Sequence, residues 1–155
     1  MIMGSGGAGK AVIAYFTKEL NNFNLYLTSR NKSYLNSDKK PKNIVWVDWQ
    51  KKSLILNTID VLINCTSIGF DRQTDITPLE DGDIRLLKKQ SIVYDIIYNP
   101  KKTLLLNLAK KNDLKIINGS EMNLLQAVLA FKYVVSTVDK KINPEKAMRE
   151  IVKSQ

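Results

Sequence analysis

Short apolar runs alternate with amphipathic and polar stretches along most of this chain. The runs that predict strands are residues 23–29, 44–47, 61–65, 92–97 and 115–117. Strands of a parallel sheet are buried on both faces, so they are apolar along their whole length, and helices occupy the connections between them. The pattern predicts an α/β fold with a doubly wound parallel sheet in three αβα layers.

Helical spacing of apolar residues recurs between these runs and after the last one. The first predicted helix is amphipathic, with an apolar face made of Ala8, Ala11, Val12, Tyr15 and Phe16. A long apolar helix is predicted from a cap at Ser120 to about Val138, and a short final helix from Asn143 with Pro144 in its first turn. We expect a single domain over residues 1–155, with a sheet core at 1–118 and a C-terminal helical segment at 119–155.

A glycine-rich turn follows only three residues into the chain. Gly4, Gly6 and Gly9 have the spacing G-x-G-x-x-G between a predicted strand and a predicted helix. In dinucleotide-binding domains one such glycine permits the tight turn, one lets backbone N–H groups reach a pyrophosphate, and one lets the helix approach the strand. Strands typically have about five or six residues. The short first strand therefore suggests that sequence upstream of Met1 is missing.

Two other interpretations of the glycines remain open. They would also suit a plain turn of an α/β protein, or the phosphate loop of an NTPase, G-x-x-x-x-G-K-[ST]. Gly4, Gly9 and Lys10 match the NTPase pattern, and Asp95 at the end of a predicted strand would suit its acidic residue. However, Ala11 stands where the pattern requires the hydroxyl that binds magnesium.

The end of the second predicted strand indicates which dinucleotide is bound. NAD domains place an acid there for the ribose 2′-hydroxyl, whereas this chain has Ser29-Arg30-Asn31-Lys32. A guanidinium can stack on adenine and bind a 2′-phosphate. A charge-assisted hydrogen bond contributes about 1.5–3 kcal/mol, which corresponds to about 10- to 150-fold preference. The expected cofactor is therefore NADP.

Composition narrows the chemistry further. The 155 residues include no histidine and one cysteine, which excludes Ser-His-Asp and Cys-His catalysis, and we predict neither a catalytic residue nor a metal site. The formal net charge of +9 comes from scattered lysines, so we expect no nucleic-acid partner. No run of about 18 apolar residues is present, and we expect no membrane partner and a cytoplasmic location.

Five blocks together resemble the C-terminal, NADP-binding half of the shikimate dehydrogenases. These blocks are residues 4–11, 29–31, 63–70, 95–105 and 119–126. The block from Asp95 to Leu105 is similar to the family's D-x-x-Y-x-P-x-x-T-x-L-L pattern and is more specific than the glycine loop. The resemblance implies a Rossmann-like fold and NADPH-dependent reduction of 3-dehydroshikimate to shikimate, in the synthesis of aromatic amino-acid precursors.

The resemblance also implies roles for individual residues. The cofactor-binding residues would be Gly4, Ser5, Gly6, Gly7 and Ala8 at the pyrophosphate, Ser29, Arg30, Asn31 and Lys32 at the 2′-phosphate, Asn64 and Thr66, and Ile96 and Gly119 beside the nicotinamide. Tyr98 and Gln126 would contact shikimate or 3-dehydroshikimate. Glu121 departs from the family pattern, because it replaces a glycine close to the expected nicotinamide.

The largest departure is that nothing here matches the family's N-terminal domain, which carries its catalytic lysine–aspartate pair. We therefore expect the chain to bind NADP(H) but to be inactive alone, and to pair with a separate N-terminal substrate domain or with a second copy as a homodimer. The long C-terminal helix would then present an exposed apolar face. A stand-alone NADP-binding sensing module and a P-loop NTPase are the alternative functions.

Overall fold

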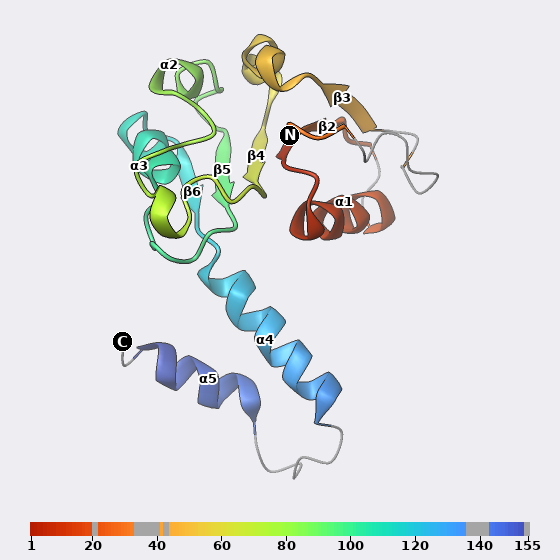
Figure 1. The fold of residues 1–155 in the computed structure, drawn as a ribbon, viewed down its shortest axis with the longest axis vertical. Coiled ribbons are helices and arrows are strands. Elements are labelled where there is room, and N and C mark those ends of the chain that lie inside the picture. Colours follow the sequence, from red (N-terminus) through yellow and green to blue (C-terminus); the bar gives the residue numbers. More distant parts are fainter. Residues whose placement is uncertain (20–21, 33–40, 42–43, 136–142, 154–155) are drawn as a thin grey trace.

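The computed structural model describes residues 1–19, 22–32, 41, 44–135 and 143–153. In this part of the chain the strands form one parallel sheet with the order β3-β2-β1-β4-β5-β6 (Figure 1). The strands are β1 (Ile2–Met3), β2 (Leu25–Thr28), β3 (Ile44–Val47), β4 (Val61–Asn64), β5 (Ile92–Asp95) and β6 (Lys115–Ile117). The predicted α/β, Rossmann-like doubly wound sheet is confirmed.

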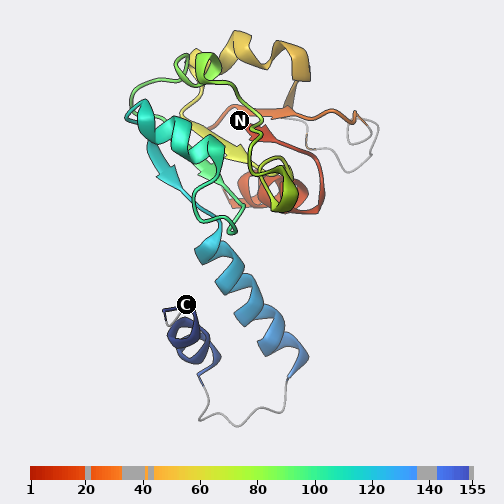
Figure 2. The same ribbon diagram turned by 60° about the vertical axis from the view of Figure 1, so that its left-hand side comes forward.

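Helices flank this sheet and extend beyond it. They are α1 (Gly7–Glu19), a 3₁₀ helix at Trp49–Thr58, a second at Asp71–Gln73, α2 (Asp81–Ile84), α3 (Leu104–Lys111), α4 (Ser120–Val134) and α5 (Pro144–Lys153). The first helix, α1, covers one face, whereas α3, α2 and the longer 3₁₀ helix lie on the other. Helix α4 projects away from the sheet with α5 packed beside it (Figures 1 and 2).

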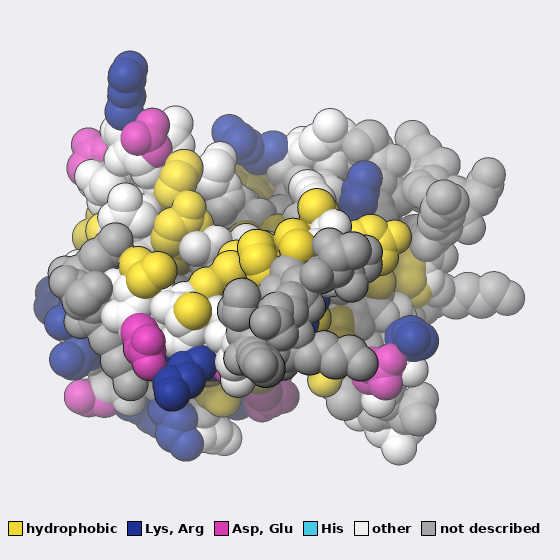
Figure 3. All heavy atoms as spheres, turned by 90° about the horizontal axis from the view of Figure 1, so that it is seen from below, with side chains coloured by type: hydrophobic (Ala, Val, Ile, Leu, Met, Phe, Trp, Pro, Cys, Tyr) yellow, Lys and Arg dark blue, Asp and Glu magenta, His cyan; other side chains and the backbone are white. Residues whose placement is uncertain are grey.

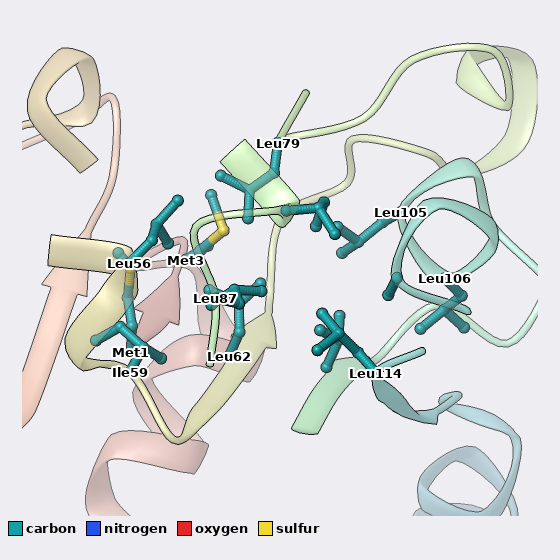
Figure 4. Close-up of a cluster of buried hydrophobic side chains, with 13 residues drawn as sticks. Met1, Met3, Leu56, Ile59, Leu62, Leu79, Leu87, Leu105, Leu106 and Leu114 are labelled. Atoms are coloured by element: carbon teal, nitrogen blue, oxygen red, sulfur yellow. The ribbon is translucent and has the colours of Figure 1, made fainter. Parts of the chain in front are cut away.

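Two hydrophobic clusters hold the sheet between these layers. Met1 and Met3 point into the larger cluster, together with leucines from the 3₁₀ helix, β4 and α3 (Figure 4). Ile2 points into the second cluster, with Ile13 of α1 and Ile63 of β4. The short strand β1 is therefore buried on both faces, as expected for the centre of a parallel sheet.

The packed face of α1 agrees in part with the predicted one. Val12 and Phe16 of the predicted stripe pack against the second cluster. Gly9 and Ile13 are buried, whereas Ala11 and Tyr15 of the predicted stripe are exposed. A Cβ built on Gly9 would lie 2.1 Å from the Gly4 carbonyl oxygen, so the helix turns this position toward β1. The close approach fixes the rotation of the helix, which apolar spacing alone did not reveal.

The ends of α4 also differ from expectation. Ser120 was expected to cap the helix, but it is the first helical residue, and its N–H group donates to Asn118 Oδ1 at 3.1 Å. The helix ends at Val134, because Val135 has φ −104° and ψ 69°. Residues 136–142, which include the expected end at Val138, lie outside the described part of the chain.

The expected start of the final helix is confirmed, because α5 begins at Pro144 and Asn143 Oδ1 accepts from the Lys146 N–H at 3.1 Å. None of the helices in the described ranges is both long enough and apolar enough to cross a bilayer.

Candidate functional site

The carboxyl ends of β1 and β4 define the candidate site. From β1 the chain builds the sheet outward through β2 and β3, and then returns to place β4 on the other side of β1. In open α/β sheets ligands bind where the strand order reverses in this way, outside the carboxyl ends of the strands. The glycine loop leaves β1 at this point, next to the loop that begins at Cys65.

The glycine loop has the backbone geometry that its sequence predicted. Gly4 has φ +100° and donates its N–H to the Thr28 carbonyl at 2.7 Å, which holds the turn against β2. A Cβ on Gly4 would lie 2.9 Å from the Cys65 carbonyl oxygen, whereas a Cβ on Gly6 or Gly7 would meet no atom within 4 Å. The middle of the loop is therefore open, and its N–H groups stand at the start of α1, where helices bind anions.

Hydrogen bonds join this loop to the end of β2. The Ser5 hydroxyl donates to Ser29 Oγ at 3.0 Å and lies 3.4 Å from the Asn31 carbonyl oxygen. The Asn31 N–H in turn donates to Ser29 Oγ at 3.3 Å. Ser5 and Ser29 therefore meet although they are 24 positions apart in the chain. Arg30, which lies between Ser29 and Asn31 in the sequence, is exposed. The expected pyrophosphate and 2′-phosphate residues are brought together at one edge.

Lys32 is the one expected 2′-phosphate residue with an acidic neighbour among the described ion pairs. Its Nζ lies 3.4 Å from Asp48 Oδ2, just beyond β3. The Gln50 N–H, together with Lys32, holds the pKa of Asp48 below its usual value. Lys32 is exposed, and this pair would compete with an anionic ligand for its charge.

Asn64 and Thr66 form a buried turn at the end of β4. Asn64 is fully buried, and its Oδ1 accepts from the Thr66 N–H at 3.0 Å and the Thr66 hydroxyl at 2.7 Å. Its Nδ2 donates to Asp95 Oδ1 at 3.1 Å and lies 3.4 Å from the Ile68 carbonyl oxygen. Because protein groups bond both the oxygen and the nitrogen of this amide, Asn64 stabilises the loop that follows β4.

Asp95 and Thr103 were not predicted as a structural pair, although both lie in the family-like block. Asp95 is fully buried at the end of β5, and its carboxylate accepts from Asn64, from the Ile97 N–H at 3.1 Å and from the Thr103 hydroxyl at 2.7 Å. Burial raises the pKa of Asp95 and these hydrogen bonds oppose the rise. The sequence signal that could have revealed this pair is an acid at the end of an apolar run, followed by a threonine directly before three leucines.

Ile96 and Gly119 meet at the carboxyl ends of β5 and β6. Ile96 is half-buried, and a Cβ on Gly119 would lie only 1.7 Å from its carbonyl oxygen. The Gly119 N–H donates to the Ile97 carbonyl at 3.0 Å. The two residues expected beside the nicotinamide are therefore neighbours, from segments that follow β5 and β6.

No family model matches the chain. It is 39% identical over 132 residues to the shikimate dehydrogenase (NADP(+)) of Clostridium botulinum strain Hall, covering 84% of this chain and 48% of that protein. The chain belongs to the shikimate dehydrogenase family.

Solved structures of dehydrogenases agree with this result. A shikimate dehydrogenase in complex with NADP+ has a TM-score of 0.74 at 27% identity, over 99% of this chain and 53% of that one. A quinate dehydrogenase from Corynebacterium glutamicum in complex with NAD has a TM-score of 0.77 at 25% identity, over 99% and 54%. The chain spans about half the length of the curated relatives it matches and corresponds to the NADP-binding, C-terminal domain of the shikimate dehydrogenase family.

The two substrate residues expected from the shikimate dehydrogenase pattern lie near one cavity, but only one of them lines it. Tyr98 lines a cavity of about 540 Å³ between the β5–α3 loop, α4 and α5, and packs against Phe70 with ring centroids 6.4 Å apart. Gln126 is exposed and donates to Asn123 Oδ1 at 2.9 Å. Asn123 lines the cavity. The Gln126 side chain is therefore hydrogen-bonded within α4 and does not line the cavity that Tyr98 lines.

Glu121, which replaces a glycine of the shikimate dehydrogenase pattern, is paired with α5. Its two carboxylate oxygens accept from Arg149 Nη1 at 3.0 Å and from Nη2, and Arg149 Nε also donates to Glu145 at 3.0 Å. The hydrogen bonds from Arg149 lower the pKa of Glu121. The acid is thus engaged with a cation rather than directed freely at the nicotinamide side.

The apolar face expected on the last long helix is present. Leu125, Leu129, Tyr133 and Val134 of α4 are exposed, as is Ile151 of α5. Apolar side chains form a band on the face seen from below (Figure 3).

Proposed function

We propose that this chain is the NADP(H)-binding part of a shikimate-dehydrogenase-like oxidoreductase that reduces 3-dehydroshikimate to shikimate. The observation that carries the proposal is the Ser5–Ser29–Asn31 cluster, which places exposed Arg30 beside an open glycine loop at the reversal point of the sheet. One cysteine, buried and free, fits a reducing compartment, and we place the protein in the cytoplasm.

Each expected cofactor contact has a physical basis in the site. The open backbone of Gly6 and Gly7, with Ala8 in the first turn of α1, suits a pyrophosphate. The 2′-phosphate of NADP would be bound by Arg30, with Ser29, Asn31 and Lys32 next to it in the chain. Thr66 would border the nucleotide from the loop that Asn64 supports, and Ile96 and Gly119 would border the nicotinamide.

Substrate contacts would come from Tyr98 and Gln126 on the nicotinamide side. Bound NADPH would supply a hydride to the ketone, and the developing alkoxide requires a proton donor. Among the described ion pairs, lysine joins an acid at Lys18–Glu19, Lys32–Asp48 and Lys88–Asp60, and none of these residues lines the Tyr98 cavity. The proposal therefore includes that this chain alone does not turn over 3-dehydroshikimate, and that a separate substrate domain or a second copy completes the site.

The two alternative functions differ in what they require of the site. A stand-alone NADP-binding sensor would use the same cofactor contacts and need no partner. A P-loop NTPase would need an acid near the glycine loop, but the Asp95 carboxylate is buried among Asn64, Ile97 and Thr103. This arrangement favours the dehydrogenase-like function over the NTPase.

A fluorescence titration of the purified chain with NADPH, NADH and Mg-ATP tests the proposal. We expect NADPH to bind most tightly. Arg30→Ala should weaken NADPH binding by about 10- to 150-fold more than NADH binding, because only NADPH has the 2′-phosphate, whereas stacking of the guanidinium on adenine is common to both. Lys89→Ala is the matched control, since Lys89 is an exposed cation far along the chain on the loop before β5.

The alternatives predict different results in the same titration. Equal loss of NADPH and NADH binding in Arg30→Ala would contradict the assigned 2′-phosphate contact. Preferential Mg-ATP binding would support the NTPase. Turnover of 3-dehydroshikimate with NADPH by the chain alone would contradict its proposed inactivity.

A further inference from the structure

An acid, Asp48, lies at the edge of the sheet where the expected 2′-phosphate residues gather. Strands β2 and β3 pair in parallel register as far as Thr28 and Val47. Ser29 and Asp48 directly follow these two residues, so the chain leaves both strands side by side at their carboxyl ends. Asp48 is therefore a neighbour of the segment 29–32, which the proposed function assigns to the 2′-phosphate.

The carboxylate of Asp48 is held by the backbone that follows it. Asp48 is the N-cap of the 3₁₀ helix Trp49–Thr58, and its Oδ1 accepts from the Gln50 N–H at 3.0 Å. Its carbonyl oxygen accepts from the Lys51 N–H at 2.9 Å. Its second carboxylate oxygen, Oδ2, lies 3.4 Å from Lys32 Nζ. Because one oxygen is bonded to the start of the helix, the position of the other is fixed with it.

Lys32 is the member of this pair that can change its partner. Its side chain is 63% exposed, against 42% for that of Asp48. A lysine ammonium stands on a flexible four-carbon stem and can turn to another anion, whereas the capping carboxylate stays at the start of its helix. The Gln50 N–H, Lys32 and Lys51 together lower the pKa of Asp48. Asp48 therefore keeps the Gln50 N–H and the nearby charge of Lys51 when Lys32 turns away.

We propose that Asp48 is a specificity-determining residue of the dinucleotide site, which lowers the preference for NADPH over NADH by holding Lys32 away from the 2′-phosphate. Binding of NADPH requires Lys32 to exchange the Asp48 carboxylate for the phosphate. NADH has a hydroxyl in place of this phosphate, so Lys32 stays paired with Asp48 when NADH binds. The inference rests on the proposed function, because it requires that the segment 29–32 meets the 2′-phosphate.

The exposure of the pair sets the size of the effect. Water and salt screen an ion pair between exposed side chains, and such a pair changes an equilibrium constant by up to about fivefold. Removal of the Asp48 charge should therefore raise the affinity for NADPH by about two- to fivefold. The affinity for NADH should stay unchanged, because no exchange of Lys32 accompanies its binding.

Parallel fluorescence titrations of Asp48→Asn and the wild-type chain with NADPH and NADH test this proposal. Asparagine keeps the oxygen that accepts from the Gln50 N–H and is as good an N-cap as aspartate, so the start of the helix is preserved. Asp113→Asn is the matched control. It removes the same charge from an exposed residue before β6, at the opposite, amino end of the sheet, and Asp113 has φ 59°, which asparagine tolerates. The control should change neither affinity.

A second substitution separates the exchange of Lys32 from simple charge repulsion. In the Lys32→Gln chain no ammonium can move between the two anions, so adding Asp48→Asn should raise NADPH affinity less than it does when Lys32 is present. An equal gain in both backgrounds would overturn the exchange. An unchanged ratio of NADPH to NADH affinity in Asp48→Asn would overturn the proposal. Weaker NADH binding in Asp48→Asn would also overturn it, because Asp48 would then bind the ribose itself.

Arg30→Ala in the same titrations distinguishes a failure of this inference from a failure of the proposed function. If Arg30→Ala reduces a wild-type preference for NADPH while Asp48→Asn leaves that preference unchanged, the role of Asp48 is wrong and the cofactor assignment stands. If the wild-type chain binds NADPH no more tightly than NADH, and Arg30→Ala weakens both equally, the cofactor assignment fails and the role of Asp48 fails with it.

Discussion

Thr103→Val removes the hydroxyl that serves both Asp95 and helix α3, and keeps the shape of the side chain nearly unchanged. The Thr103 hydroxyl donates to Asp95 Oδ2 at 2.7 Å, and as the N-cap it accepts from the Leu106 N–H at 3.3 Å. Thr103 is 1% exposed and Asp95 is fully buried, so water cannot replace either bond without rearrangement.

The expected cost follows from these two bonds. A hydrogen bond to a charged group contributes about 1.5–3 kcal/mol. Loss of an N-cap side chain costs typically about 1 kcal/mol. Together the free energy of unfolding should fall by about 2.5–4 kcal/mol, a large part of the roughly 5–15 kcal/mol by which domains are stable.

The cost should also depend on pH, because it comes from a buried charge. Burial raises the pKa of Asp95 in the folded chain, and the Thr103 hydrogen bond opposes this rise. A carboxyl whose pKa is raised on folding takes up its proton in the native state first, so the resulting stabilisation is complete below the unfolded pKa, about 3.9, and is lost as pH rises through the folded pKa. Thr103→Val raises the folded pKa further, and its destabilisation should therefore shrink as pH falls toward 4.

Urea unfolding of both chains at pH 7 and at pH 4.5 measures both effects. Thr103→Ser is the control, since it keeps the hydroxyl and loses one methyl group, at about 0.8 kcal/mol. Two results would contradict a stabilising hydrogen bond from Thr103 to the Asp95 carboxylate. One is equal stability of Thr103→Val and Thr103→Ser at pH 7, and the other is the same loss of unfolding free energy in Thr103→Val at both pH values.

Two further substitutions test the contacts that Gly119 and Glu121 make after β6. Gly119→Ala should destabilise the chain by about 1–3 kcal/mol or more and weaken NADPH binding, because its Cβ would meet the Ile96 carbonyl at 1.7 Å. Gly82→Ala in α2, where a Cβ meets nothing within 4 Å, should instead be neutral or stabilise by about 0.4–1 kcal/mol in the same urea assay. Glu121→Gln should speed hydrogen exchange of α5, since it removes the charge paired with Arg149, and exposed Glu150→Gln should not. As the pKa of Glu121 is lowered, wild-type α5 should keep this protection at pH 5 and lose it only as pH falls through that lowered value.

Much of the sheet could be predicted, because its signal lies in consecutive residues. The strands at 44–47 and 115–117 have the predicted bounds, and the others differ only at their ends. Local spacing also predicted the backbone of the glycine loop, where Gly4 has a positive φ and Gly9 contacts the turn. The face of α1 was predicted in part, because Val12 and Phe16 of the stripe pack against the second cluster. The Gly9–Gly4 contact, which the apolar stripe does not show, turns Gly9 toward β1.

The roles of Asn64, Asp95 and Thr103 could not be assigned from local patterns. Asn64 and Asp95 are 31 residues apart and meet because β4 and β5 are adjacent and in register. The bond between Glu121 and Arg149 spans 28 residues and depends on how α5 returns along α4. Sequence resemblance named Asn64 as a cofactor residue, and this role stays a prediction. The structure adds that the Asn64 amide is hydrogen-bonded to protein groups.

The sequence by itself determined the fold class, the dinucleotide turn and the family, because each depends on residue types at short, fixed spacing. Only the tertiary structure decided which polar groups are hydrogen-bonded inside the protein and which stay exposed. That distinction depends on strand order and register, which bring distant side chains within hydrogen-bonding distance. It left Arg30 exposed next to Ser29 and Asn31 at the glycine loop, and it buried Asp95 at the neighbouring strand ends.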